Sequence, residues 1–246
     1  MQGKGLFQGN LIQKQKKSLL MNSSNAVEIL RNFPLFNGLT ESEFTELSTM
    51  IEWKSKPKYT TLYETGDPSD RVYFLFKGTV KSCTLSGDGR EVIKTILHPI
   101  TLFGELGLVG EKQRHETAIT MNEDVAYCTL SIPDFQRLMR SNHLLCLNIL
   151  EMIGARLLQV EEKLEALIFK DARARIIDFL KDSAMKQGRK VGYEMLFKHC
   201  LTQQDIANIT GTSRQTVTSV LNDLRKENLI YFNRNTILIR DLGKLS

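Results

Sequence analysis

Two short helices joined by a tight turn are encoded in the last fifth of the chain, and no other segment restricts the fold as much. Thr202 and Asp205 form a variant of the capping box, which starts a helix. Gly211 ends that helix, because the turn needs a residue without a Cβ atom. Thr212 and Gln215 form a second capping box, where the next helix is expected to begin. The segment therefore predicts two helices that follow one another through a short turn.

The two predicted helices carry matching apolar faces. A small Ala four residues before Gly211 and a Val six residues after it allow the helices to cross closely at a steep angle, as a helix-turn-helix requires. The side chains expected to face inward are Ile206, Ala207, Ile209, Val217, Val220, Leu221 and Leu224. A helical hairpin used only for packing is the alternative, but the capping, the turn and the polar outer face all favour the helix-turn-helix.

The outward side chains of the second helix, residues 213–224, suit contact with nucleic acid. Arg is the usual bidentate partner of guanine, and Gln can pair with adenine. The N-terminal end of such a helix meets base edges in the major groove of double-stranded DNA. The residues predicted to bind DNA, including two at the start of the first helix and one in the following hairpin, are Thr202, Gln203, Ser213, Arg214, Gln215, Thr218, Ser219 and Arg234.

A wing is predicted directly after the second helix. Residues 229–232 form an apolar run, residues 233–235 a polar Asn-Arg-Asn turn, and residues 236–240 return. The charge distribution agrees with a DNA-binding C-terminal part. Residues 171–246 hold 13 basic and 8 acidic side chains, whereas residues 25–170 hold 16 basic and 20 acidic ones. A polyanion is therefore expected to bind the C-terminal third.

A narrow apolar stripe precedes this region. Its members follow one another at alternating spacings of four and three residues over about three heptads, and they are Cys146, Leu150, Ile153, Leu157, Val160, Leu164 and Leu167. Such a 3.5-residue period is typical of a helix pair, whereas an ordinary core helix has a broader apolar face. The stripe predicts a long helix that pairs with a second copy of the chain, and one amphipathic helix packed on its own domain is the alternative.

The middle of the chain has the texture of a β-structure. Short runs rich in Val, Ile, Thr, Tyr and Phe recur between residues 60 and 131, separated by Gly and Asp. Strands at intervals of about 8–12 residues predict a sandwich, barrel or roll. Residues 86–89 are expected to form a hairpin turn, since Asp-Gly supplies the positive φ that such turns require.

The remaining sequence features concern the N-terminal segment, the cellular location and the cysteines. Residues 1–24 hold four Lys and no acid, and are expected to form a basic flexible tail. No uninterrupted apolar window reaches the length of a membrane span, and no secretory signal is evident, so we expect a cytoplasmic protein without membrane contact. Cysteines 83, 128, 146 and 200 are widely spaced and lack His at metal-ligand spacing, so they are expected to be free thiols and no metal site is predicted.

The order of β-roll, long heptad helix and winged helix-turn-helix resembles the CRP/FNR superfamily of bacterial transcription regulators. The best-matched pieces are residues 66–67, 103–108, 155–160 and 169–171, and the helix-turn-helix with Ser213-Arg214. The resemblance implies an α+β fold. A cyclic-nucleotide-binding-like roll is expected over residues 25–142, a dimerisation helix over 143–170 and a winged helix-turn-helix over 171–246. The resemblance further implies a homodimeric regulator, not an enzyme, that binds a near-palindromic operator. It leaves RNA polymerase open as a protein partner.

The resemblance also locates an effector pocket in the roll. In the cAMP-binding members a Gly-Glu-Leu turn contacts ribose and phosphate, and an Arg about ten residues later pairs with the phosphate. The turn matches Gly104, Glu105 and Leu106, but counting along the chain places His115 or Glu116 at the Arg position, followed by Thr117, with Arg114 out of register. A carboxylate at the position of this Arg would repel the phosphate of cAMP. Glu105 is then expected only to cap the turn of the roll.

Neither the adenine of cAMP nor the other effectors of the superfamily find clear binding residues in this sequence. The long helix carries Val160, Glu161 and Glu162 where the cAMP-binding members have the hydroxyl pair that holds adenine. We therefore expect no cofactor and no response to cAMP, with the effector unknown or absent. Iron–sulfur members carry an N-terminal cysteine cluster, but no Cys precedes Cys83, while His98, His115 and Cys83 are candidate haem ligands in a haem- or redox-sensing alternative.

Two further classes of function are weighed against a DNA-binding regulator. A cyclic-nucleotide-binding regulatory module would share the roll, but it would not need the 202–221 motif. A metal-dependent enzyme on a cupin-like roll would need clustered His and Glu, and no two His lie close together on one predicted strand.

Overall fold

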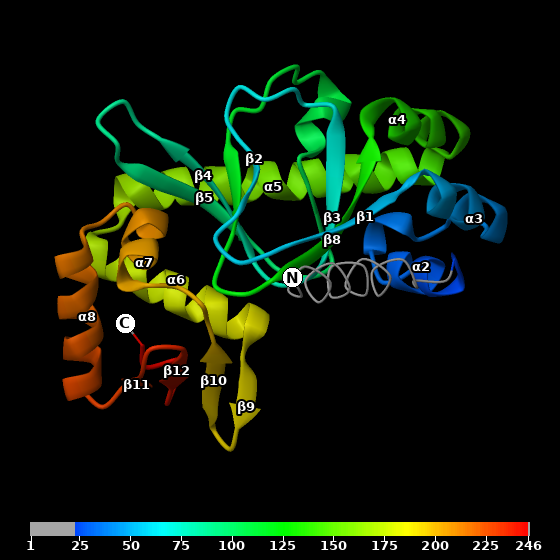
Figure 1. The fold of residues 1–246 in the computed structure, drawn as a ribbon. Coiled ribbons are helices and arrows are strands. Elements are labelled where there is room, and N and C mark those ends of the chain that lie inside the picture. Colours follow the sequence, from blue (N-terminus) through cyan, green and yellow to red (C-terminus); the bar gives the residue numbers. More distant parts are fainter. Residues whose placement is uncertain (1–22, 246) are drawn as a thin grey trace, which may run out of the picture. The chain divides into compact units, whose positions relative to one another are not determined.

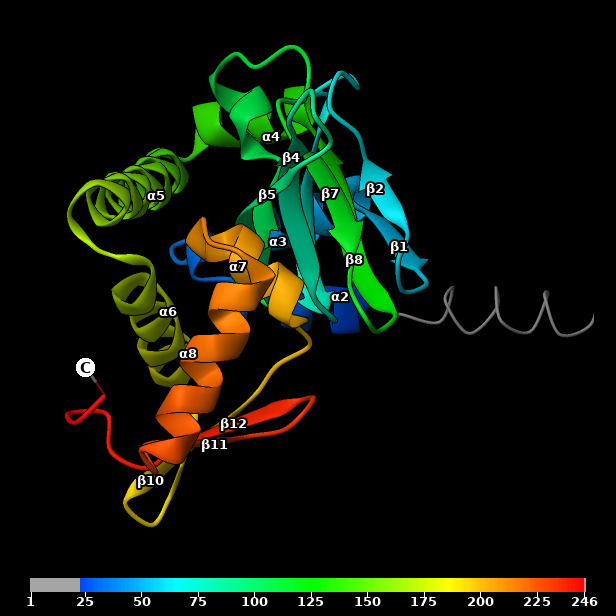
Figure 2. The ribbon, with the colours of Figure 1, turned by 90° about the vertical axis from the view of Figure 1, so that its left-hand side faces the viewer.

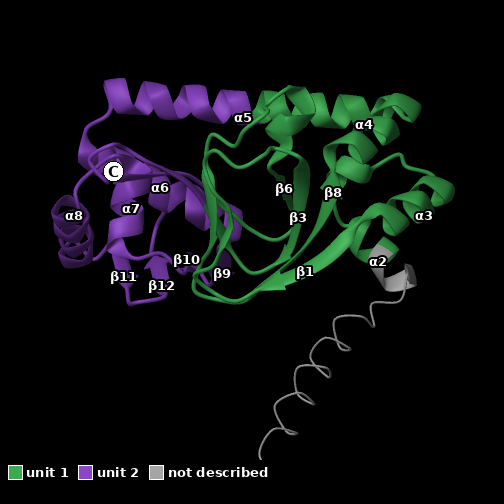
Figure 3. Cartoon of the chain, turned by 45° about the horizontal axis from the view of Figure 1, so that its top comes forward, with its two compact units in different colours: residues 1–81, 96–155 green, residues 82–95, 156–246 purple. Residues whose placement is uncertain are grey.

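The computed structural model describes residues 23–245 and has an α+β fold (Figure 1). By spatial proximity the chain divides into two compact units (Figure 3), one of residues 1–81 and 96–155, the other of residues 82–95 and 156–246. The predicted basic tail lies almost entirely outside the described residues. Helix α2, Ser23–Leu30, is the first element described.

The roll consists of two four-stranded sheets with the strand orders β1-β8-β3-β6 and β2-β7-β4-β5. The strands are β1 (Glu52–Lys56), β2 (Thr61–Tyr63), β3 (Arg71–Lys77), β4 (Val80–Leu85), β5 (Glu91–Leu97), β6 (Thr101–Phe103), β7 (Thr117–Thr120) and β8 (Val125–Ser131). The expected β-roll is thus confirmed. Sequence reasoning missed β1 and β6, because β1 is a mostly exposed edge strand of sequence Glu-Trp-Lys-Ser-Lys and β6 has only three residues.

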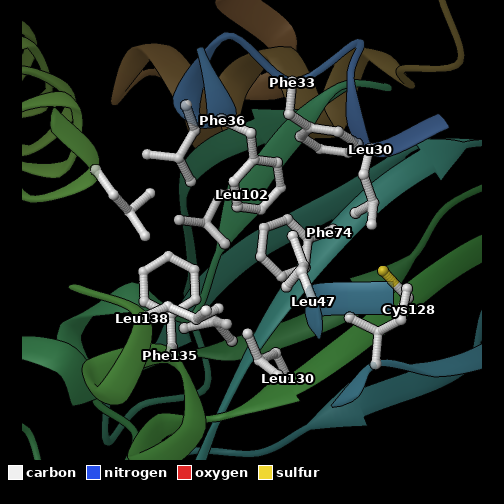
Figure 4. Close-up of a cluster of buried hydrophobic side chains, with 14 of the residues drawn as sticks. Leu30, Phe33, Phe36, Leu47, Phe74, Leu102, Cys128, Leu130, Phe135 and Leu138 are labelled. Carbon is white, nitrogen blue, oxygen red and sulfur yellow. The ribbon is translucent and has the colours of Figure 1, made fainter. Parts of the chain in front are cut away.

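Helices cover one end of the roll. They are α2, η1 (Pro34–Phe36), α3 (Glu41–Met50), η2 (Glu105–Val109) and α4 (Ile132–Ser141). Their apolar sides share a core with β3 and β8, in which Phe33, Phe36, Phe74 and Phe135 are almost fully buried (Figure 4). The ring centroids of Phe33 and Phe74 lie 5.6 Å apart in an edge-to-face arrangement, which fixes the N-terminal segment on the roll.

The hairpin between β4 and β5 turns where the sequence predicts. The Ser86 N–H donates to Arg90 O at 2.9 Å, the Gly89 N–H donates to Ser86 O at 2.9 Å, and Gly89 has a φ of +80°. None of the four cysteines forms a disulfide, and burial raises the pKa of the Cys128 thiol far above its usual range.

Helix α5 runs without interruption over 27 residues, His143–Phe169. Its first half is anchored to the roll by Leu145 and Ile149, each 1% exposed. Within the described part of the chain it is also the one helix long and apolar enough to cross a membrane by length and composition alone.

The C-terminal domain has three helices and a small antiparallel sheet. The helices are α6 (Ala172–Gln187), α7 (Gln203–Thr210) and α8 (Arg214–Lys226). The strands β9 (Arg189–Val191), β10 (Glu194–Lys198), β11 (Ile230–Phe232) and β12 (Thr236–Ile239) pair in the order β11-β12-β10-β9. The expected winged helix-turn-helix is confirmed, and β9 and β10 extend the wing to four strands, which the sequence analysis did not anticipate.

Candidate nucleic-acid interface

The first helix of the motif, α7, begins with a complete capping box. The Asp205 N–H donates to Thr202 Oγ1 at 3.1 Å, and Asp205 Oδ2 accepts from the Thr202 N–H at 2.8 Å. Two donors that a helix start leaves open are thereby satisfied. The helix ends at Gly211, whose φ of +62° is the left-handed conformation that favours glycine. Both ends of α7 follow the sequence prediction.

The second helix starts one residue later than predicted. Ser213 is its N-cap, and Ser213 Oγ accepts from the Thr216 N–H at 3.0 Å. Thr212 instead belongs to the turn: its N–H donates to Ala207 O at 3.0 Å, and its hydroxyl lies 3.0 Å from the Thr210 hydroxyl. The predicted capping box of Thr212 with Gln215 is therefore wrong, because the turn uses the backbone and hydroxyl groups of Thr212.

The two helices share a buried apolar face. Figure 2 shows the ribbons of α7 and α8 next to one another. Of the seven predicted inward residues, Ile209 alone is only partly buried, and Thr210 takes a buried place beside it. Buried residues of α6 and the sheet complete this core: Ile176, Ile177, Leu180, Ala184, Phe197, Ile230, Ile237 and Ile239. Because its inner face is fixed in this way, α8 presents its other face to solvent.

The predicted DNA-contacting side chains fall at the N-terminal end of that outer face. Ser213, Arg214, Gln215 and Ser219 are exposed. Thr218 is half-buried: its hydroxyl lies 2.7 Å from Gln203 Oε1 and 2.8 Å from Arg214 O. This contact joins the start of α7 to α8 and turns the amide nitrogen of Gln203 away from Thr218.

The wing turn is built by Asn233. Asn233 Oδ1 accepts from the backbone N–H groups of Asn235 and Thr236, both at 3.0 Å, and the Asn233 N–H donates to Thr236 O at 3.0 Å. Arg234 is exposed at the tip of this turn. An Asx turn of this kind holds the loop in one conformation and leaves the charged side chain toward solvent.

His199 connects the wing to the start of α7, a role that sequence reasoning missed. Its backbone N–H donates to Asn235 O at 2.9 Å, and both ring nitrogens are buried without a hydrogen-bond partner. Burial lowers the pKa of His199 below its usual 6.5, and the Leu201 backbone opposes this shift in part. A His outside any metal-ligand spacing gives no signal in the sequence.

We expect acid to destabilise this domain through His199. Because its folded-state pKa lies below the unfolded value of 6.5, the contribution of the neutral ring is complete above pH 6.5 and is lost as the pH falls toward the lower folded-state pKa. Between pH 7.5 and 5, a His199→Phe variant should lose less stability than the wild type in chemical denaturation. Equal losses in the two proteins would show that this ring does not cause the pH dependence.

In the roll, the structure corrects the placement of Arg114. Counting along the chain puts it out of register, yet its side chain is buried and Nη1 donates to Gly104 O at 2.9 Å. A second bond joins Arg114 Nη2 to Arg71 O, and the guanidinium carbon lies 4.5 Å from the centroid of the Tyr63 ring. Counting residues along the chain cannot detect this position of Arg114, because it ignores the course of the loop and the direction of the side chain.

Aromatic rings fill the inside of the roll around this guanidinium. Tyr73 lies 5.0 Å from Phe103, 5.2 Å from Tyr63 and 5.9 Å from Tyr127, measured between ring centroids. Burial raises the pKa of Tyr63 beyond its usual range, and the Glu116 carboxylate adds to this effect while Arg114 opposes it. The roll interior is thus closely packed and already holds one cation.

The predicted effector residues are only partly brought together. Glu105 is buried with 6% exposure, whereas Leu106 is 42% exposed on η2. Glu116 accepts from the Tyr63 hydroxyl at 3.1 Å. The Thr117 hydroxyl accepts from the Thr65 N–H at 3.1 Å. Among the described residues, no group of three or more His, Cys, Asp and Glu side chains is placed to hold a metal ion.

The apolar stripe of α5 separates into two parts. Cys146 and Ile153 are half-buried: the Cys146 thiol donates to Met139 O at 2.9 Å, and Ile153 packs against the roll core. The other members remain more than half exposed, namely Leu150, Leu157, Val160, Leu164 and Leu167. A stripe of leucines facing water is unusual on a monomer and typical of an interface.

Comparison with known proteins agrees with this geometry. Residues 53–142 match the model of the cyclic nucleotide-binding domain, and residues 174–246 match that of the Crp-like helix-turn-helix domain. The solved structure of a CooA mutant from Carboxydothermus hydrogenoformans is similar, with a TM-score of 0.73 and 27% identity, covering 87% of this chain and 94% of that one. FixK2 from Bradyrhizobium japonicum shares the fold, with a TM-score of 0.71 and 21% identity over 79% of this chain and 95% of that one.

Curated relatives are similar over most of their length. A "CRP-like cAMP-activated global transcriptional regulator" of Mycobacterium tuberculosis (strain ATCC 25618 / H37Rv) is 29% identical over 219 residues, 89% of this chain and 97% of the relative. The "Global nitrogen regulator" of Synechocystis sp. is 30% identical over 190 residues, 76% of this chain and 83% of the relative. With its roll, its long helix and its winged helix-turn-helix, the chain belongs to the CRP/FNR family and is a transcription regulator with a helix-turn-helix DNA-binding domain.

Proposed function

We propose that this regulator is a homodimer that binds a near-palindromic operator through α8, and that its roll does not respond to cAMP. The observation that carries the DNA-binding part is the exposed N-terminal end of α8. There Ser213, Arg214 and Gln215 project from a helix whose opposite face is fixed in the core. A two-fold dimer would place two such helices in successive major grooves, about 34 Å apart.

Dimerisation is supported by the second half of α5. Leu157, Val160 and Leu164 are 57–62% exposed and follow one another at the spacing of a helix pair. The same helix is a poor membrane span, because Glu151 and Arg156 would lie within the hydrocarbon. We therefore assign α5 to pairing with a second copy and place the regulator with the DNA in the cytoplasm.

The roles of the polar residues follow from their positions. Arg214 is proposed to read guanine, with Gln215, Thr218 and Ser219 influencing neighbouring base pairs. Thr202 and Gln203 lie at the start of α7, where open backbone N–H groups and the helix dipole favour a phosphate, and Arg234 would meet phosphate from the wing. RNA polymerase is a further partner expected of a transcription regulator.

Selection from random DNA tests this proposal. The wild-type protein should enrich a near-palindrome whose half-sites lie roughly one helical turn apart, about 10 base pairs. In the cAMP-binding members an acidic residue follows the Arg, and a second Arg lies five residues after the first. Gln215 and Ser219 stand at these positions here, so the preferred half-site should differ from theirs. Enrichment of no motif, or of single half-sites only, would contradict the proposal.

The packing of the roll supports the absence of a cAMP response. The Arg114 guanidinium already donates to the Gly104 and Arg71 carbonyls and stacks on Tyr63, so a phosphate would have to displace these contacts. The Glu116 carboxylate at the Tyr63 hydroxyl adds negative charge nearby. For these reasons we do not transfer the cAMP activation named for the M. tuberculosis relative to this chain.

Titration calorimetry with cAMP should therefore detect weak binding or none at physiological concentration. Glu116→Arg should not restore full binding either, because α5 lacks the hydroxyl pair associated with adenine binding. A Glu116→Gln variant controls for the loss of the carboxylate alone. Micromolar binding of cAMP by the wild type, with tighter binding to DNA in its presence, would overturn this part of the proposal.

A further inference from the structure

One guanidinium in the C-terminal domain joins two separate stretches of backbone through three carbonyls. Arg175 of α6 donates from Nη1 to Lys170 O at 2.7 Å, from Nε to Thr210 O at 2.9 Å and from Nη2 to Gly211 O at 3.2 Å. Each of its three nitrogens thus contacts a different carbonyl. Arg can do this because its N–H groups lie in one rigid plane, whereas Lys has a single nitrogen.

These carbonyls lie at the ends of two other helices. Thr210 is the last residue of α7 and Gly211 its C-cap, while Lys170 follows the last residue of α5 and its N–H donates to Ala166 O at 3.1 Å. Carbonyls at the C-terminal end of a helix lack intrahelical partners and carry the negative end of the dipole. A cation with several donors is therefore well suited to hold both ends.

A packing contact reinforces the same junction. A Cβ atom at Gly211 would lie 3.1 Å from Leu167 Cδ2, so the last turn of α5 sits directly against the turn of the helix-turn-helix. The start of α6 is fixed as well, since Asp171 Oδ1 accepts from the Ala174 N–H at 2.7 Å. The end of α5, the start of α6 and the turn before α8 therefore meet around Arg175.

We infer that Arg175 is a positioning residue that sets the half-site spacing of the operator. This inference rests on the proposed homodimer and its two-fold operator. In such a dimer the two α8 helices are connected through α5, so the orientation of the turn on the end of α5 determines how far apart they lie. Loss of the three hydrogen bonds of Arg175 would allow each α8 helix to change its orientation relative to α5. The side chains that contact DNA would stay the same.

A neighbouring residue of the same helix provides a matched control. Arg173 lies two positions earlier, its side chain is 36% exposed, and it pairs with Glu227 at 3.2 Å on the surface. Arg173→Ala and Arg175→Ala remove the same charge from α6. Only Arg175→Ala also removes the hydrogen bonds that join the ends of α5 and α7. Arg175→Lys keeps the charge and can satisfy at most a part of the three carbonyls.

The experiment is a binding competition in which the wild-type half-site pair is separated by spacers of different length. The wild type and Arg173→Ala should prefer one spacer strongly. Arg175→Ala and Arg175→Lys should bind that spacer roughly tenfold more weakly, as expected for lost charge-assisted hydrogen bonds, and discriminate less against neighbouring spacers. Enrichment within each half-site should stay the same. Thermal melting followed by circular dichroism shows whether the variants are folded. If Arg175→Ala does not fold, Arg175→Lys tests the inference in its place.

The outcomes separate the two proposals. If the wild type selects no paired half-sites, the proposed function fails and the inference fails with it. If the wild type prefers one spacer and folded Arg175 variants keep the same preference, even with a lower melting temperature, Arg175 is only structural and the inference alone is overturned.

Discussion

A variant carrying Leu157→Asp and Leu164→Asp is expected to be monomeric at micromolar concentration. Both leucines are more than half exposed on α5, so the substitutions should leave the fold of the single chain intact. In a two-fold dimer they remove four buried leucines. At about 1.5–3 kcal/mol for each leucine, the loss is at least about 6 kcal/mol, or roughly 10⁴-fold in the dissociation constant. Carboxylates buried at the interface would add to it.

Light scattering measures the mass of the variant directly. Gln159→Asp is the matched control for Leu157→Asp, because it adds the same acid to an exposed position of the same helix, outside the stripe. It should remain dimeric. Leu157 and Leu164 are preferable to Ile153 for this purpose, since Ile153 also packs against the roll core. A double variant that stays dimeric would place the interface elsewhere.

The second large effect is expected at Arg214. Arg214→Ala should weaken binding to the selected operator by about 1–3 kcal/mol per half-site, about 5- to 150-fold, and relax the preference at one base pair. The substitution leaves the Ser213 cap and the buried face of α8 in place, so the helix should remain folded. Selection on random DNA with both proteins shows which position loses information.

Arg234→Ala in the wing provides the contrast. Loss of a phosphate contact should weaken all sequences alike and reduce the salt dependence of binding by about one unit of slope per half-site. The selected motif should therefore be unchanged for Arg234→Ala and altered for Arg214→Ala. If Arg214→Ala selects the same motif with the same information at every position, Arg214 does not read a base.

The sequence alone predicted the architecture well, because the deciding signals are local. The cap at Thr202, the turn at Gly211 and the apolar spacing of α8 each depend on residues a few positions apart, and the structure reproduces them. The roll follows for the same reason, since β-branched and aromatic runs separated by turn residues form strands. Short or polar strands such as β1 and β6 carry too weak a pattern to be recognised.

The tertiary structure decided what depends on distant residues. Whether Thr212 or Ser213 caps α8 is settled by the turn packed between two helices, and which members of the α5 stripe remain exposed is settled by the roll beneath its first half. The burial of Arg114 beside Gly104 depends on the course of a loop. The junction at Arg175 depends on three carbonyls from two separate segments, which no linear spacing relates. Periodicity and capping act over one or two turns of chain, whereas a side chain's partners are set only when the segments have packed together.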